Sequence, residues 1–94
     1  MTPRTRRDRI GQAFGLVINR LRLNKGWATS VLARRAGMSE SYLRLVQHGQ
    51  SMPTLLVIIE LAEVLDVTPA ELVRMATEVP APPPQAPDPP IIDG

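Results

Sequence analysis

Three polar side chains within five residues, Glu40, Ser41 and Arg44, carry hydrogen-bonding groups that suit the exposed edges of DNA bases. Glutamate can accept from the N4 amino group of cytosine, serine can donate or accept, and arginine can donate two parallel hydrogen bonds to guanine. The neighbouring Leu45 can touch the methyl group of thymine. Because an α-helix fits into the major groove, these residues on the outer face of one helix would suit base recognition.

The segment around these residues has the spacing of two short helices joined by a tight turn. Apolar residues share one face of each helix: Leu32, Ala33 and Ala36 in the first, and Leu43 and Val46 in the second. Gly37 can adopt the left-handed conformation that ends the first helix, and Ser39 can cap the second. The spacing indicates a helix-turn-helix, although a solvated outer face in a small helical bundle fits the same pattern.

The charges are separated along the chain. Residues 1–44 contain ten Lys or Arg and two acidic residues, a balance of +8, whereas residues 45–94 contain one Arg and seven acidic residues, a balance of −6. The first half therefore suits contact with a polyanion such as DNA, since neutralising phosphates supplies most non-specific affinity. A membrane-surface role is disfavoured because only Phe14, Trp27 and Tyr42 are aromatic.

With 94 residues, the chain has room for one small domain. We expect a flexible basic arm over residues 1–9, a helical domain over 10–78 and a disordered proline-rich tail over 79–94. The arm could contact DNA or merely solubilise the chain. Apolar periodicity predicts a first helix over residues 10–23, after which Trp27 is expected to plug the core. The predicted fold class is all-α.

Two further helices are predicted after the helix-turn-helix. Thr54 can cap a helix that runs to about residue 65, and residues 68–71 (Thr-Pro-Ala-Glu) form a capping box that starts a helix ending near residue 78. The helix over 54–65 has almost no polar face. The core is expected to take one stripe of this helix, formed by Ile58, Leu61, Ala62 and Leu65. The apolar residues outside this stripe would remain exposed, and such a surplus is typical of an association surface. We expect a dimer interface of Leu55, Leu56, Ile59, Leu72 and Met75.

Nothing in the sequence favours catalysis. The chain has no Cys and a single histidine, His48, whose place at a helix end suits a contact to the helix dipole or a phosphate better than general base catalysis. No metal-ligand cluster, cofactor motif, small-molecule sensor domain or membrane-spanning run of apolar residues is recognisable. We therefore expect a cytoplasmic protein that is not an enzyme and needs no metal or cofactor.

The chain resembles the Cro/repressor-type (XRE-type) helix-turn-helix family over about residues 14–73. The matching positions are Gly15, Ile18, Leu21, Arg22, Gly26, Leu32, Ala33, Ala36 to Ser39, Leu43, Val46 to Gly49, Pro53, Ile58, Leu61, Ala62 and Leu65 to Val67. The resemblance implies a bundle of five helices whose third helix reads bases. The implied base contacts are Glu40, Ser41 and Leu45, with Arg44 beside them. The implied phosphate contacts are Ser39 and the segment near Thr29 and Ser30, while His48 lies at a helix end that suits a phosphate contact.

Two departures from the family pattern affect the expected site. Where the family has a Ser or Thr cap followed by Gln, this chain has Ala28 and Thr29, so either Thr29 takes over as the cap or the phosphate contact is weaker. The family's Arg–Glu pair becomes Arg22 and Gln47, which reduces a salt bridge to at most a hydrogen bond. Leu45 could contact thymine or simply pack, and Glu40 could select cytosine or only stabilise the helix N-terminus.

The resemblance implies a transcriptional regulator, as a repressor or autoregulator, that binds double-stranded DNA as a homodimer. Its pseudo-palindromic operator would have half-sites about 34 Å apart. Small proteins of this family resemble phage repressors, restriction–modification controllers and antitoxin regulators. A protein-interaction module that docks a partner through residues 54–65 is the alternative from a different class.

Overall fold

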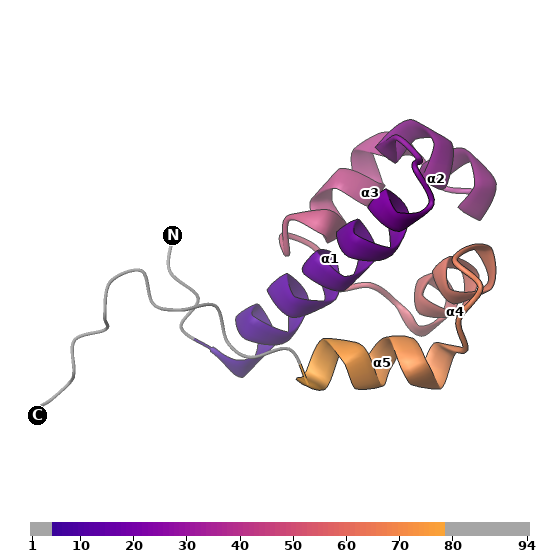
Figure 1. Cartoon of the computed structure of the whole chain (residues 1–94). Helices are drawn as coiled ribbons and strands as arrows, with labels where there is room; N and C mark the ends of the chain where they lie inside the picture. Colours follow the sequence, from indigo (N-terminus) through magenta and orange to yellow (C-terminus); the bar gives the residue numbers. More distant parts are fainter. Residues whose placement is uncertain (1–4, 79–94) are drawn as a thin grey trace, which may run out of the picture.

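Residues 5–78, the part of the chain that the computed structural model describes, form five α-helices and no strand (Figure 1). The helices are α1 (Arg6–Asn24), α2 (Thr29–Ala36), α3 (Glu40–Gln47), α4 (Leu55–Val64) and α5 (Pro69–Glu78). The predicted all-α fold of five helices is thus confirmed. The predictions of an arm over residues 1–4 and of a disordered tail over 79–94 lie outside the described residues.

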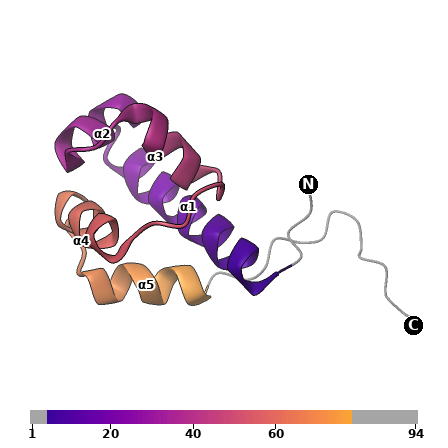
Figure 2. The same ribbon diagram turned by 180° about the vertical axis from the view of Figure 1, so that it is seen from behind.

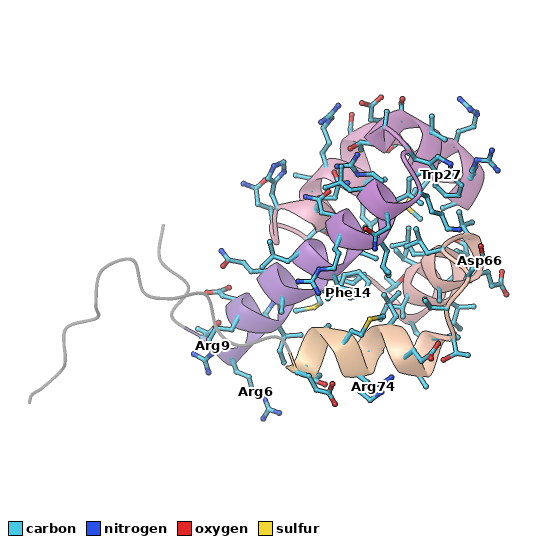
Figure 3. All side chains as sticks on the ribbon, in the orientation of Figure 1. Arg6, Arg9, Phe14, Trp27, Asp66 and Arg74 are labelled. Carbon is cyan, nitrogen blue, oxygen red and sulfur yellow. The ribbon has the colours of Figure 1, made fainter. Side chains whose placement is uncertain are left out.

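The long helix α1 packs against α3 and α5, while α2 packs against both α3 and α4 (Figures 1 and 2). Every helix contributes to one core, whose largest fully buried side chains are Ile18, Leu32, Leu43, Val46, Leu61 and Leu72. Phe14 points from the middle of α1 into this core (Figure 3).

Helix α1 begins earlier than the sequence pattern predicted. Thr5 caps it by accepting a hydrogen bond from the backbone N–H of Asp8 at 3.0 Å, and Asp8 lies in the first turn. This local capping overrides the absence of apolar residues, because a cap and an acidic residue both stabilise a helix N-terminus. Arg6 and Arg9 are therefore helical and exposed, and residues 6–9 do not belong to a flexible arm.

Helix α4 buries one stripe and exposes another. Leu61, Ala62 and the C-cap residue Leu65 are buried, and Ile58 packs against the core, as the sequence predicted. Thr54 is the N-cap of the helix, and its hydroxyl accepts from the backbone N–H of Val57 at 3.2 Å. Within residues 5–78, no helix has both the length and the apolar character that crossing a lipid bilayer requires.

The predicted capping box starts α5. The Thr68 hydroxyl accepts from the backbone N–H of Glu71, and the Glu71 carboxylate accepts from the backbone N–H of Thr68, both at 3.0 Å. This start turns Leu72 and Ala76 toward the core, since residues four apart share a helix face. Val73 faces outward instead and is 44% exposed.

Candidate nucleic-acid interface

The corner between α2 and α3 has the geometry that the sequence predicted. Gly37 adopts φ 74°, and its N–H donates to the carbonyl of Arg34, while the N–H of Met38 donates to the carbonyl of Ala33 at 3.0 Å. Ser39 then caps α3 by accepting from the backbone N–H of Tyr42 at 3.1 Å. Because the side-chain oxygen serves as the acceptor, the Ser39 O–H can still donate to a phosphate.

Helix α3 is seated on α1 at a point where no side chain fits. A Cβ atom on Gly15 would lie only 2.2 Å from the carbonyl oxygen of Gln47, which is backbone and cannot rotate away. Leu43 and Val46 are fully buried beneath α3. The close approach and the buried pair fix the depth and the rotation of α3, so its opposite face must point outward.

A polar network behind α3 joins it to α1 and α2. The Asn19 side-chain oxygen accepts from Gln47 Nε2 at 3.0 Å and from Arg22 Nη2 at 3.0 Å. Arg22 Nη1 also donates to the carbonyl of Trp27 at 2.7 Å. The expected direct hydrogen bond between Arg22 and Gln47 is therefore replaced by contacts that both residues make to Asn19.

Sequence reasoning missed Asn19, because only the packing of α3 on α1 brings its side chain to Gln47. Gln47 is 8% exposed, so its amide needs hydrogen-bonding partners within the protein. Asn19 lies three residues before Arg22 on the same helix, and residues with this spacing can touch. That spacing is the only signal in the sequence that could have suggested the contact between Asn19 and Arg22.

Thr29 is the first residue of α2 and not its cap. The N-cap position belongs to Ala28, and among residues 5–78 no side chain caps the first turn of α2. The Thr29 hydroxyl lies 3.3 Å from Gln47 Nε2 and can accept from it. The backbone N–H groups at the start of α2, together with the exposed Ser30, therefore form an electropositive helix end.

Thr29 and Ser39 lie at opposite ends of α3. Ser39 caps the N-terminus of α3, whereas Thr29 contacts Gln47, the last residue of α3. A helix of eight residues is about 12 Å long, which is close to the width of the major groove. The two residues predicted to contact phosphates therefore lie at opposite ends of one helix.

The outer face of α3 carries the predicted base-contacting residues. Ser41 and Arg44 are exposed, Glu40 is half-exposed, and Leu45 is 43% exposed and so does not belong to the core. Arg44 Nη2 forms an ion pair with the Glu40 carboxylate one turn earlier. The structure therefore brings all four together on one surface, with Glu40 and Arg44 in direct contact.

His48 follows directly at the C-cap of α3. Its ring atom Nδ1 lies 2.8 Å from the carbonyl oxygen of Arg44, and the side chain is exposed. A carbonyl oxygen can only accept, so this contact requires the ring to carry a proton on Nδ1. The second ring nitrogen, Nε2, is then the atom that remains for a phosphate.

Trp27 packs against the core beside α2, in agreement with its predicted role, and also holds two basic side chains. The guanidinium of Arg35 lies 4.6 Å and the ammonium of Lys25 5.3 Å from the centroid of the Trp27 ring (Figure 3 labels Trp27). Lys25 also forms a 2.7 Å ion pair with Asp66. These contacts order two cations in the basic half of the molecule.

The five residues predicted to form the dimer interface differ in their exposure. Leu55 and Leu56 at the start of α4 are 72% and 62% exposed, whereas Ile59 and Met75 are half-buried. Leu72 is 0% exposed and was wrongly assigned to an interface, because it fills the core of its own chain.

Comparison with known proteins places this architecture among helix-turn-helix proteins. A helix-turn-helix family model matches residues 18–72. A relative from Sinorhizobium fredii (strain NBRC 101917 / NGR234), the uncharacterized HTH-type transcriptional regulator y4dJ, is 38% identical over 74 residues. That match covers 79% of this chain and 91% of the relative.

Two solved structures have a similar fold. The restriction-modification controller protein C.AhdI from Aeromonas hydrophila has 37% identity and a TM-score of 0.64, covering 66% of this chain and 94% of that one. The clp gene regulator ClgR from Corynebacterium glutamicum has 19% identity and a TM-score of 0.70, covering 82% of this chain and 95% of that one, and supports the fold alone. With more than half of its length matched by the family model, the chain belongs to the Cro/repressor-type (XRE-type) family of helix-turn-helix proteins.

Proposed function

We propose that this protein is a sequence-specific DNA-binding transcriptional regulator that inserts α3 into the major groove. The observation that carries the proposal is the outward face of α3, where Glu40, Ser41, Arg44 and Leu45 lie together on a helix held rigidly from behind. Residues of these types match the donors, acceptors and methyl groups of base edges. A merely solvated face would not need the close approach at Gly15 that fixes the rotation of α3.

Phosphate contacts orient α3 in this proposal. Ser39 donates its O–H to one strand, and Thr29 with Ser30 at the uncapped start of α2 bind the other. His48 provides a further contact at the end of α3. Such contacts set the register of a protein on DNA without selecting a sequence.

We further propose that the active form is a homodimer on a pseudo-palindromic operator. Leu55 and Leu56 are exposed at the start of α4, and Ile59 in α4 and Met75 in α5 are half-buried. Burying large exposed leucines between two chains is favourable, at about 25 cal/mol per Å² of apolar surface. Two copies of α3 would then meet half-sites about 34 Å apart.

We propose that the protein regulates by occupying its operator, as a repressor or autoregulator. Of the regulator classes that the sequence left open, a restriction–modification controller is favoured by the similarity to C.AhdI at 37% identity. We place this class ahead of phage repressor and antitoxin regulator.

The test is selection of bound sequences from a random pool of duplex DNA, followed by titration of the selected duplex. Affinity should fall steeply between about 50 and 200 mM salt, because phosphate contacts release counterions. Arg44→Ala should weaken the selected duplex more than a random one. The matched control is Arg74→Ala, which changes an equally charged residue on α5, on the far side from α3, and should alter neither (Figure 3).

Absence of DNA binding at low salt would contradict the proposal. It would then favour the alternative, a protein-interaction module that uses the exposed start of α4 around Leu55 and Leu56. Equal losses on the selected and the random duplex would show that Arg44 contacts phosphate and not bases.

A further inference from the structure

The ion pair between Glu40 and Arg44 joins two side chains that were expected to act separately. Arg44 Nη2 contacts Glu40 Oε2 across one helical turn, with the side chains 55% and 42% exposed, respectively. Both side chains meet on the N-terminal half of the outer face of α3. They therefore meet one point in the groove, where successive base pairs are about 3.4 Å apart.

The contact with Arg44 reduces the repulsion between the Glu40 carboxylate and the phosphates of DNA. A lone carboxylate in the major groove would be repelled by the phosphates on both sides, whereas a carboxylate bound to a guanidinium carries no net charge as a pair. The pair also leaves hydrogen-bonding capacity unused. Arginine has five N–H donors in a planar fork, and an ionised carboxylate has about four acceptor positions.

We propose that Glu40 and Arg44 recognise a single G·C base pair as one unit. Arg44 donates two hydrogen bonds to O6 and N7 of guanine, while Glu40 holds the guanidinium in place and accepts from N4 of the paired cytosine. These three base atoms lie side by side along the same groove edge, and their donor and acceptor order matches the ion pair. The inference rests on the proposed function, and it adds the base pair that this site selects.

Glu40 thus has two roles in recognition. It contacts cytosine directly, and it positions Arg44 so that fewer rotamers are lost on binding, because a pre-oriented side chain gives up less conformational entropy. The two residues should consequently act on the same base pair and not independently. A replacement that breaks the pair should remove most of the discrimination that both provide.

The experiment measures the affinity of the full chain for its selected duplex and for duplexes carrying each alternative base pair at every position of one half-site. Wild type is compared with Glu40→Gln, Arg44→Gln and the double variant. We expect each single variant to lose about 5- to 150-fold discrimination against the wrong bases, at the same base pair. The double variant should lose little more than either single variant, which is the signature of coupling.

Two additional variants guard against misfolding and non-specific charge effects. Arg44→Lys keeps the charge and the helix but loses the fork, so it should retain binding to random DNA while losing discrimination at that base pair. The control is the ion pair of the same spacing on α5, Arg74 to Glu78 at 3.5 Å. Replacing both of its members by Gln should leave discrimination unchanged.

The outcomes separate the inference from the proposed function. If wild type shows no preference for any sequence, the proposed function fails and the inference with it. If wild type binds a specific sequence but the two residues affect different base pairs, or their losses add, the proposed function stands and the coupled recognition is wrong.

Discussion

The two halves of the molecule use the same local chemistry to start their helices but present opposite outer faces. Ser39 caps α3, and Thr54 caps α4, through the same hydroxyl-to-backbone hydrogen bond. The outer face of α3 carries an ion pair, Glu40 to Arg44, whereas the start of α4 exposes Leu55 and Leu56. Capping decides where a helix begins, while the residues left over after the core is filled decide what it can bind.

The halves also differ in how firmly their outward helix is held. Helix α3 is fixed by the close approach at Gly15 and by the hydrogen bonds through Asn19. Helix α4 is held by apolar packing of Leu61 and Ala62, without a polar network of that kind among the side-chain hydrogen bonds of residues 5–78. Base recognition requires an orientation fixed by geometry, whereas apolar association tolerates small shifts. Stability and DNA binding should therefore respond to substitutions of only a few atoms in the half that contains α3.

The largest effect is expected from Gly15→Ala. The added Cβ would overlap the backbone carbonyl of Gln47, so α1 and α3 must separate. Overpacking of this kind destabilises by about 3 kcal/mol or more, well above the roughly 1 kcal/mol that alanine gains in a helix. Urea unfolding followed by Trp27 fluorescence measures the change, and DNA binding should be lost with it.

Gly11→Ala is the matched control for this change. A Cβ there would lie 3.5 Å from the carbonyl oxygen of Gly49, an ordinary contact, so the free energy of unfolding should stay the same or rise. Equal destabilisation by the two variants would mean that the close contact of α3 with Gly15 does not set its position.

The next largest effect should come from Leu55→Glu combined with Leu56→Glu. Both side chains are largely exposed, so the fold of a single chain should be unchanged while association of two chains is opposed by charge repulsion. Sedimentation should report a monomer, and operator affinity should fall about 100-fold because the two half-sites are no longer bound together.

Leu23→Glu provides the comparison for that variant. Leu23 is 63% exposed on α1 and lies outside the proposed interface, so its replacement should leave a dimer. If wild type itself sediments as a monomer at micromolar concentration, or if Leu23→Glu disrupts the dimer equally, the proposed interface is wrong.

A smaller change is expected from Asn19→Ala. The replacement leaves the amide of Gln47 and part of the Arg22 guanidinium without their shared acceptor, at a cost of about 1–3 kcal/mol for the buried groups. Asn24→Ala, at the exposed end of the same helix, should change the free energy of unfolding by less than about 0.5 kcal/mol. Equal values for the two variants would show that the network does not stabilise the fold.

The sequence predicted those parts of the structure that depend on local chemistry. The left-handed Gly37, the cap at Ser39 and the capping box at Thr68 follow from residue types over four or five positions, and each is confirmed. The predicted dimer residue Leu72 was wrong because periodicity does not say which of several apolar residues the core will take. Only tertiary packing decided that Val73 faces outward in its place.

Contacts between segments far apart in the chain could not be predicted from the sequence, because they too depend on tertiary packing. Asn19 and Gln47 are 28 residues apart, and no local pattern specifies their hydrogen bond. The start of α1 was missed for the opposite reason, since the cap at Thr5 is local but lies among charged residues without apolar periodicity. A search for caps that ignores hydrophobic pattern would have found it.

The smallest expected effect concerns the contact of His48 with phosphate. The Nδ1–H of its ring donates to the Arg44 carbonyl, so Nε2 is the ring atom left for a phosphate. His48→Ala should weaken DNA binding about two- to threefold, because one exposed phosphate contact among several is lost. Unchanged affinity in this variant would exclude the contact. Because phosphate contacts carry no sequence information, the loss should be equal on selected and random duplexes, unlike any effect of Glu40 or Arg44.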